Sequence, residues 1–354
     1  MKIIFNLQGV GLANNGGSST IVRSANVLAS LGHEVYVVSE KKNELTWVAL
    51  NGPTYIKTDG LVCTYPSAHA IIATGVHSVQ HVLNASARVG KKYWWIRAHE
   101  TWAMKEADIL KLYSNLHIKP IVNSVCLKNF ILKKLNKDLP IVRPGVDPTV
   151  FYQTNGRNWN KKEFVLGGLY CDKPRKRMQW IVEIYEACKQ RKLSVKLHLF
   201  GTYDEPKDTM HDKYVKTPDS QRLRDFYNEV DIWLAPSESE GLHIPPQEAM
   251  LCGCVVIGAN EPLSGMKDYL FESNAIAGTT GYYMKHWSDA VDIIENWYTD
   301  RDTMAEISAN GRKQILKLGD RFDNMKLFVN TLKKIGEDPL TLKRRELELK
   351  RRGR

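Results

Sequence analysis

The fold is decided by one segment, Asp231-Ile-Trp-Leu-Ala-Pro-Ser-Glu-Ser-Glu-Gly-Leu-His-Ile-Pro-Pro-Gln-Glu-Ala-Met-Leu-Cys-Gly-Cys-Val-Val-Ile257. Its apolar runs predict a strand over 231–235 and another over 254–257, with a helix over 246–252 between them. A strand, helix and strand at this spacing form a right-handed parallel crossover. The polar loop that begins at Ser237 therefore follows the carboxyl end of a parallel strand, where open α/β sheets bind ligands.

The same strand-and-helix alternation extends outward along the chain in two series. Further strands are predicted over 2–8, 33–39, 70–74, 92–97, 120–124, 141–144, 164–169 and 195–200. Helices are predicted over 125–135, 175–190 and 220–229, and as a succession over 287–335. A chain of 354 residues is too long for one ordinary core. We therefore expect an α/β protein with two tandem Rossmann-like, doubly wound domains that face a cleft. Their predicted bounds are 1–155 and 156–335; the last helix is free to return to the first domain, and 336–354 form a basic tail.

Composition narrows the class of protein. The chain is 43% hydrophobic and 25% charged, with no apolar run of the ~18 residues that a membrane span needs and no signal-peptide pattern at the N-terminus. Its six cysteines form no CxxC pair, which favours free thiols in a reducing cytoplasm. No Asp-x-Asp follows a predicted strand, so we expect no bound metal and no cofactor.

The positive charge is concentrated in the first half. Residues 1–160 hold 18 Lys and Arg against 9 Asp and Glu, whereas residues 161–354 hold 32 against 30, and the net charge of the chain is +11. A basic half attracts an anionic partner such as nucleic acid, a charged glycan or an anionic membrane surface, or it simply keeps the protein in solution. The amphipathic stretch 127–135 is a candidate for resting on a membrane.

Two glutamates give the 237–250 loop its chemistry. Glu240 lies in the loop and Glu248 in the first turn of the following helix, and each carboxylate can accept two hydrogen bonds from sugar hydroxyls. The backbone N–H groups of Gly241, Leu242 and His243 add donors. The alternative to a sugar-binding role is that the two glutamates belong to an acidic surface loop and only cap the helix that follows it.

Two basic or glycine-rich stretches provide candidate phosphate sites. Arg175 and Lys176 begin the helix after the 164–169 strand, where a fixed cation stabilises a leaving phosphate; the alternative is a solvated helix face. Gly16 and Gly17 lie in a glycine loop before a helix predicted to be capped by Ser18 or Ser19, and such loops let backbone N–H groups approach a phosphate. A dinucleotide fingerprint is disfavoured because position 14 is asparagine.

Taken together, these blocks resemble the family-4 group of retaining GT-B glycosyltransferases (glycosyltransferase group 1). The resemblance rests on Glu240 and Glu248 with seven residues between them and on the run Ala249-Met-Leu-Cys-Gly-Cys-Val-Val-Ile257. It is extended by Gly16-Gly17, Leu31-Gly-His-Glu-Val35, Val142-Arg-Pro-Gly-Val-Asp147 and Gly265-Met-Lys-Asp-Tyr269, and it spans about 1–335.

The resemblance implies a role for each of these positions. Glu248 is expected to bind the ribose of a nucleotide and Glu240 the donor sugar. The amides of Gly241 to His243 are expected to contact sugar hydroxyls, and Lys176 to pair with the diphosphate.

Two departures from the family pattern stand out. Gly168 occupies the position where members often carry a phosphate-binding arginine, and Lys173, Arg175 or Arg143 are candidates to replace it. Leu242-His243 replaces the common Phe-Gly, so His243 either interacts with a hydroxyl or fills space.

In the first domain, His99 follows a predicted strand at the cleft end. It either contacts the reacting sugar or caps a helix, with Glu100 as the second candidate.

The expected activity is a metal-independent, retaining transfer of a hexosyl or pentosyl group from a nucleotide-diphosphate sugar, most simply a UDP-sugar, to an acceptor hydroxyl. The acceptor is expected to be a cell-surface glycan or a lipid-linked intermediate, handled in the cytoplasm or at the inner face of the membrane. Two alternatives remain at this stage. One is transfer to a hydroxymethylated base of DNA, as in some phages, for which Tyr93, Trp94, Trp95 and Trp102 are stacking candidates, although the first three are expected in the sheet core. The other is a non-catalytic nucleotide-sugar-binding protein.

Overall fold

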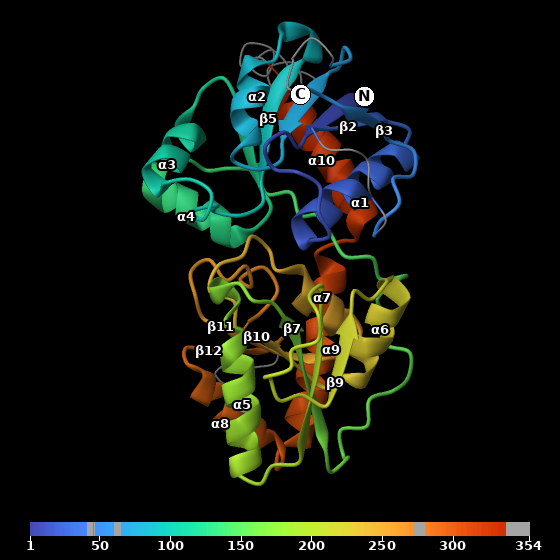
Figure 1. Ribbon diagram of the computed structural model, residues 1–354, viewed down its shortest axis with the longest axis vertical. Helices are drawn as coiled ribbons and strands as arrows, with labels where there is room; N and C mark the ends of the chain where they lie inside the picture. The colour runs from blue at the N-terminus through green and yellow to red at the C-terminus, as the bar shows by residue number, and fades with distance from the viewer. Residues whose placement is uncertain (41–44, 46, 60–64, 272–279, 338–354) are drawn as a thin grey trace, which may run out of the picture.

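The computed structural model describes residues 1–40, 45, 47–59, 65–271 and 280–337. Two α/β halves follow one another along the long axis of the molecule (Figure 1). In the described part of the chain, each half contains one six-stranded sheet in which every strand pairing is parallel. The predicted α/β class with two doubly wound domains is confirmed.

The first sheet has the strand order β3-β2-β1-β4-β5-β6. Its strands are β1 (Lys2–Asn6), β2 (Glu34–Ser39), β3 (Thr54–Lys57), β4 (Ala70–Ala73), β5 (Lys91–Ile96) and β6 (Lys119–Val122). The second sheet repeats this topology as β12-β11-β10-β7-β8-β9. Its strands are β7 (Phe164–Tyr170), β8 (Val195–Gly201), β9 (Lys213–Lys216), β10 (Ile232–Ala235), β11 (Val255–Ala259) and β12 (Tyr282–Met284). In both sheets the order reverses beside the first strand, which creates the switch point where such folds bind ligands.

Helices cover both faces of each sheet. The α-helices are α1 (Gly16–Ser30), α2 (Ser78–Asn84), α3 (Glu106–Ser114), α4 (Val125–Leu135), α5 (Met178–Gln190), α6 (Ser220–Glu229), α7 (Ile244–Leu251), α8 (Trp287–Trp297), α9 (Arg301–Lys317) and α10 (Arg321–Gly336). Two short 3-10 helices are η2 (Ala87–Val89) and η3 (Pro174–Lys176). Because strand side chains alternate, Ile3 and Phe5 pack under α1 and α10, whereas Ile4 and Ile71 face α2.

The last helix lies on the first sheet although it follows the second domain in sequence (Figure 1). The ring of Phe328 in α10 lies 4.9 Å from that of Trp95, and Tyr93 donates a hydrogen bond of 2.7 Å to the carbonyl of Leu332. The chain therefore passes between the halves twice, after β6 and between α9 and α10.

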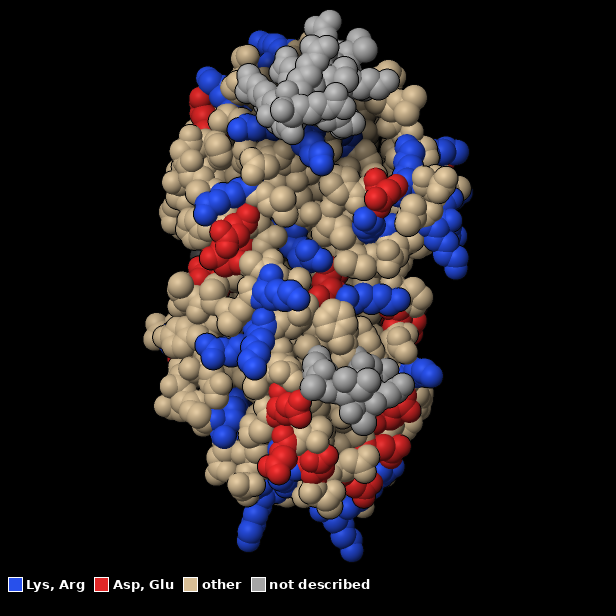
Figure 2. Space-filling view, turned by 180° about the vertical axis from the view of Figure 1, so that it is seen from behind, with Lys and Arg blue, Asp and Glu red and all other residues tan. Residues whose placement is uncertain are grey.

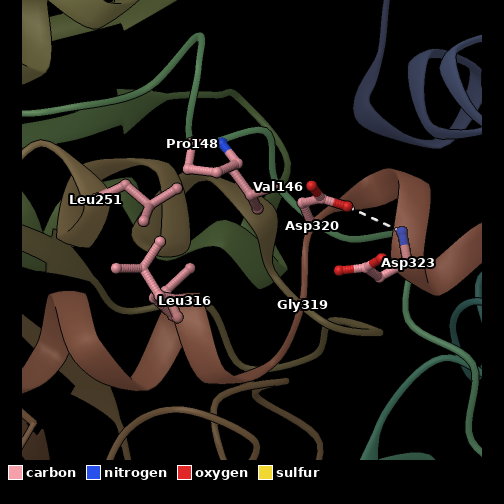
Figure 3. A pocket seen from close by; sticks show the side chains of 8 residues that line it. Val146, Pro148, Leu251, Leu316, Gly319, Asp320 and Asp323 are labelled. Atoms are coloured by element: carbon pink, nitrogen blue, oxygen red, sulfur yellow. Dashed lines mark hydrogen bonds between the residues drawn. The ribbon is translucent and has the colours of Figure 1, made fainter.

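The two crossings contact each other. Gly145 has a φ of +73°, and a Cβ there would lie 2.6 Å from the backbone nitrogen of Arg321. A small pocket of about 130 Å³ lies beside this contact (Figure 3). It is lined by Val146, Pro148, Leu251, Ile315, Leu316, Gly319, Asp320 and Asp323. The Asp320 side chain caps α10 by accepting the N–H of Asp323, so this polar group of the pocket stabilises the helix that begins where the chain returns to the first half.

Several sequence expectations were wrong in detail. Asn15, and not Ser18 or Ser19, caps α1, because its side chain accepts the N–H of Ser18. The predicted 141–144 strand reduces to one bridge between Ile141 and Val122. The edge strands β3, β9 and β12 were not predicted, whereas α2 and α3 lie where helical stretches were expected between strands, without predicted bounds.

Other expectations were confirmed. Tyr93, Trp94 and Trp95 are buried in the first core. Cys126, Cys171, Cys188, Cys252 and Cys254 are buried free thiols, whereas Cys63 lies outside the described residues, as does the basic tail from 338 onward. No helix of the described ranges is long and apolar enough to span a membrane.

The amphipathic helix α4 uses its apolar side within the protein. Cys126, Leu127 and Ile131 are buried in the first core, which leaves Leu132 exposed beside Lys133 and Lys134. The outward face of α4 is therefore mainly basic, and contact with a membrane stays a prediction.

Candidate functional site

The loops that follow β7 and β10 meet at the switch point of the second sheet, because β7 and β10 are neighbours. Lys176 ends η3 in the first loop, and Glu240 lies in the second. The ammonium of Lys176 forms an ion pair with the Oε1 atom of Glu240. Their side chains are only 16% and 13% exposed, so this is a largely desolvated pair. The structure thus brings two of the predicted donor residues into direct contact.

The backbone enters α7 through His243, whose φ of +53° is unusual for a residue with a side chain. Its Nε2 atom lies 3.9 Å from the same oxygen of Glu240, and its Nδ1 atom is buried without a hydrogen-bond partner in the described structure. Gln247 and Tyr269 donate hydrogen bonds to the carbonyl of His243 and hold the loop in place. His243 therefore lines the site with a buried ring.

The electrostatics of this group are dominated by burial and by Lys176. Burial lowers the pKa of His243 to about 4, so the imidazole is neutral at pH 7. Burial also acts to raise the pKa of Glu240, but the positive charges around it, Lys176 foremost, outweigh this effect and hold that pKa at about 2. Because His243 is neutral, Lys176 is the partner that keeps Glu240 ionised at neutral pH.

Glu248 lies on α7 and is 9% exposed. The hydroxyl of Tyr227 in α6 donates a hydrogen bond of 3.1 Å to its Oε2 atom. Burial raises the pKa of Glu248, whereas the charges of Arg23 in α1 and Arg321 in α10 oppose that shift. Both arginines approach from helices that cover the first sheet, so Glu248 faces the junction of the halves. Neither they nor Tyr227 was predicted from the sequence.

Arg97 connects the glycine segments of the two halves. Its guanidinium donates hydrogen bonds to the carbonyls of Gly17 and Thr74. Its own carbonyl lies so close to Gly241 that a Cβ at position 241 would collide with it. The predicted residues Gly17 and Gly241 are therefore brought together through Arg97. A Cβ at Gly16 would meet nothing within 4 Å, so the N-terminus of α1 is open there.

His99 packs against residues of α3 and α4. Its ring lies 4.4 Å from that of Phe130, its Nδ1 atom lies 3.2 Å from the Tyr113 hydroxyl, and its Nε2 atom lies 3.6 Å from Glu106. Burial lowers its pKa. A catalytic role for His99 stays a prediction, and the described contacts are those of a histidine packed beneath α3 and α4.

Glu100 faces the junction instead. Its carboxylate accepts the N–H of Val76 at 2.5 Å. Burial raises its pKa, while the charges of Arg97 and Arg175 oppose the rise. The charge of Arg175 also acts on Glu240 and His243, so Glu100 and the Lys176–Glu240 pair border the same arginine.

The three candidates for the missing phosphate arginine lie in different places. Gly168 itself has no room for a side chain, because a Cβ there would lie 2.6 Å from Ile181 in α5. Arg143 is engaged with Asp268 at 2.6 Å, and Lys173 is exposed at the start of η3. Arg175 donates a hydrogen bond of 3.3 Å to the carbonyl of Ser239. Arg175 is thus the candidate adjacent to Glu240.

Charged side chains gather where the two halves meet. Figure 2 shows both basic and acidic side chains at the narrowing between them. Across the described ranges, no group of three or more His, Cys, Asp or Glu side chains could hold a metal ion. The arrangement offers Lys176 with Arg175 beside it, two carboxylates and a set of loop amides at a switch point, a combination suited to a phosphorylated, polyhydroxylated ligand.

Comparison with known proteins agrees with this chemistry. Residues 161–291 match the family model described as "Glycosyl transferases group 1". The second half carries a glycosyl transferases group 1 domain. The match supports sugar transfer as the activity and includes Lys176, Glu240 and Glu248. No curated protein sequence matches the chain.

The fold of the whole chain, including the group 1 domain, is that of GT-B glycosyltransferases. HepE from Anabaena, solved with UDP and glucose, has a TM-score of 0.75 at 15% identity, over 94% of this chain and 100% of that one. Sucrose-phosphate synthase from Thermosynechococcus elongatus has a TM-score of 0.73 at 13% identity, over 94% and 98%. A glycosyltransferase from Rickettsia africae has a TM-score of 0.74 at 11% identity, over 95% and 99%.

Proposed function

We propose that this chain is a retaining, metal-independent glycosyltransferase of the family-4 type that transfers a hexosyl group from a UDP-sugar to a hydroxyl of a glycan acceptor. The observation that carries the proposal is the largely buried Lys176–Glu240 pair at the switch point of the group 1 domain, next to Gly241, against which the Arg97 carbonyl of the first half packs. HepE, a protein of the same fold, has been solved with UDP-glucose, which supports the donor class.

The donor would occupy the loops around this pair. Its diphosphate would take Lys176 as counter-ion, with Arg175 beside it as the second cation. Glu248 would accept the ribose hydroxyls. Glu240 and the amides of Gly241 to His243 would hold the sugar. Lys176 pairs with Glu240 in the structure. A donor diphosphate would compete with Glu240 for Lys176, and the Glu240 carboxylate would then be free to accept a hydroxyl hydrogen bond.

The reaction needs no metal and no strong base in this scheme. The acceptor oxygen bonds to the anomeric carbon on the face from which the diphosphate departs, and the bond between that carbon and the phosphate oxygen breaks. The acceptor proton passes to the departing phosphate oxygen, so UDP and a glycoside with retained configuration are formed. Lys176 stabilises the charge that develops on the leaving group, and contact between the halves excludes water, which would otherwise hydrolyse the donor.

The acceptor side is the first half. Its excess of basic residues favours an anionic glycan or a lipid-linked saccharide at the inner membrane face. The exposed lysines of α4 fit such a surface. A DNA acceptor has no specific contact in its favour and enters as an outcome of the test.

The test is a screen of the purified protein with UDP-glucose, UDP-galactose and UDP-N-acetylglucosamine, with UDP release as the readout. We expect one donor to be hydrolysed slowly in the absence of acceptor, and NMR of a transferred product to give the donor's anomeric configuration. Glu248→Ala is expected to weaken UDP binding at least tenfold while the circular dichroism spectrum is unchanged. If UDP affinity is unchanged in this variant, Glu248 does not bind the ribose. If sugar is transferred to hydroxymethylated DNA, the acceptor is DNA and not a glycan.

A further inference from the structure

The turn that follows β5 exposes a tryptophan beside the candidate site. Trp102 is 52% exposed, and it is the largest exposed apolar side chain among the described residues. A single exposed indole is not unusual by itself, and what matters here is its position beside the candidate site. The neighbouring aromatic residues Trp94 and Trp95 are buried in the sheet, so Trp102 stands apart from that core.

One arginine joins Trp102 to the reaction site across the junction of the halves. The guanidinium carbon of Arg175 lies 4.2 Å from the centre of the Trp102 ring, a cation–π contact. The same guanidinium donates to the carbonyl of Ser239, and the next residue, Lys176, pairs with Glu240. The indole is therefore separated from the Lys176–Glu240 pair by a single side chain.

The turn that carries Trp102 is held firmly. The carboxylate of Glu100 accepts the N–H of Val76, and its carbonyl accepts the N–H of Ala103 at 2.9 Å. On the neighbouring loop, a Cβ at Gly75 would lie 2.8 Å from Val10 and 3.4 Å from the Glu100 carboxylate. Val10 is itself 38% exposed. Val10 and Glu100 therefore both lie against Gly75, and Glu100 precedes Trp102 by two residues in the same turn.

We infer that Trp102 is the stacking platform for a sugar ring of the acceptor. The face of an aromatic ring is electron-rich, and the C–H bonds on one face of a pyranose are weakly positive, so the two faces attract while apolar area is buried. Arg175 lies over the face of the indole at 4.2 Å, and Trp102 is 52% exposed, so part of the indole is open to a sugar ring. Glu100, two residues before Trp102, can accept hydrogen bonds from hydroxyls of that ring, and Arg175 can donate to them.

The charges nearby favour a saccharide over DNA. Besides Glu100, the carboxylates of Glu238 and Glu261 lie close to the arginine that follows Lys176, and Glu238 is 58% exposed. The phosphates of a duplex carry no hydrogen-bond donor for these carboxylates to accept. A saccharide presents hydroxyls that the same carboxylates bind.

The inference rests on the proposed function, and the test separates the two. To test the stacking role, protein saturated with UDP is applied to an array of immobilised oligosaccharides and to a duplex that contains 5-hydroxymethylcytosine. To test the proposed function separately, the affinity of the protein for UDP is measured by calorimetry. We expect saccharide binding that Trp102→Ala weakens at least ~tenfold and Trp102→Phe weakens less than ~threefold, because a smaller aromatic ring keeps the stacking face. Trp180→Ala is the matched control, since Trp180 stacks on Arg177 at 4.5 Å in the second half. It is expected to bind saccharide as the wild type does.

Each outcome decides one of the two ideas. The stacking role of Trp102 is overturned if Trp102→Ala binds saccharide as well as the wild type does, or if the UDP-loaded wild type binds no saccharide. In both cases the proposed function stands as long as the wild type binds UDP. Failure of the wild type to bind UDP overturns the proposed function instead. Retention on the modified duplex alone, lost in Trp102→Ala, assigns the indole to a flipped base and rejects the saccharide.

Discussion

At the scale of single residues, the site is a balance of a few charges in a largely dry environment. Lys176 and Glu240 each lose hydration, and the ion pair compensates for that loss only while both partners are present. A ligand that brings its own negative charge can take over one side of the pair. The chemistry of the site therefore depends on Lys176 more than on any other residue. Lys176 is the counter-ion of Glu240 in the structure, and under the proposed function it would be the counter-ion of the donor diphosphate.

Lys176→Met is expected to lower the rate of UDP release by about 10²–10³-fold, because the leaving diphosphate loses its fixed positive charge. The variant also leaves Glu240 buried without its partner. Stopped assays of UDP release at saturating UDP-sugar would measure the effect. Lys189→Met, on the exposed side of α5, is the control and should retain the wild-type rate. Comparable rates for the two variants would remove Lys176 from the mechanism.

His243 gives a prediction about pH. Its pKa in the folded protein is about 4, below the ordinary value of 6.5, so only the unfolded chain takes up this proton between those values. Stability from this group is therefore complete above pH 6.5 and is lost as the pH falls towards 4. Between pH 7 and pH 5 the unfolding free energy of the wild type is expected to fall by about 1–2 kcal/mol more than that of His243→Gln. Urea unfolding at the two pH values measures this, with the exposed His117→Gln as control. An identical pH dependence in His243→Gln would show that the imidazole takes up its proton over the same pH range in the folded and the unfolded chain.

At the scale of elements, the sequence was most informative where strand, loop and helix follow one another. The α6 and α4 helices were predicted to the residue because their caps and apolar spacing are local signals. The strands β3, β9 and β12 were not predicted, because an edge strand of three or four residues has a weak pattern and depends on its neighbour for hydrogen bonds. The cap of α1 was misassigned because Asn15 and Ser18 are both good capping residues, and only the backbone shows which one precedes the first turn.

One element is capped from the other half of the protein. Asp268, after β11, accepts the N–H of Val125 at the start of α4 at 2.9 Å and pairs with Arg143. The Asp268 carboxylate is fully buried, so its removal leaves a helix N–H and a cation without a partner. Asp268→Ala is expected to lower the unfolding free energy by about 3 kcal/mol.

Denaturant titration followed by circular dichroism would measure this loss. The control is Asp292→Ala, which removes the partner of Arg191 from a pair in which Asp292 is 62% exposed. Because exposed pairs contribute little, that variant should lose less than about 1 kcal/mol. Similar losses in both variants would mean that the Asp268 cap contributes no more than a surface ion pair.

At the scale of the whole molecule, the features that complete the site come from contacts between distant segments. Glu240, Glu248 and Lys176 were predicted together because each follows a predicted strand and because the family resemblance assigns all three to one donor site. Nothing in the sequence indicated that Arg23 and Arg321 face Glu248, or that Arg175 stacks on Trp102, because these pairs are 70 or more residues apart and belong to different halves. Such contacts depend on how the halves are set against each other, and no local pattern encodes that arrangement.

Gly241 tests how much the site depends on this arrangement. A Cβ at position 241 would collide with the carbonyl of Arg97 and would lie 2.9 Å from the Asn123 side-chain nitrogen, and both groups belong to the first half. Backbone and a hydrogen-bonded side chain cannot move aside cheaply, so we expect Gly241→Ala to push the halves apart and leave each core intact. Sugar transfer to the acceptor should fall at least tenfold relative to donor hydrolysis, because Lys176 and Glu240 would become hydrated and water would compete with the acceptor.

Two measurements distinguish separation of the halves from local damage to the loop. Small-angle scattering should give a larger radius of gyration for Gly241→Ala, and amides at the β5 and β10 loop ends should exchange faster, with both sheets still protected. Gly156→Ala is the matched control, since a Cβ at that exposed position meets nothing within 4 Å. If Gly241→Ala keeps the wild-type radius but still loses activity, the glycine serves the donor sugar directly through its backbone. If it keeps both, the contact between Gly241 and Arg97 has no part in function.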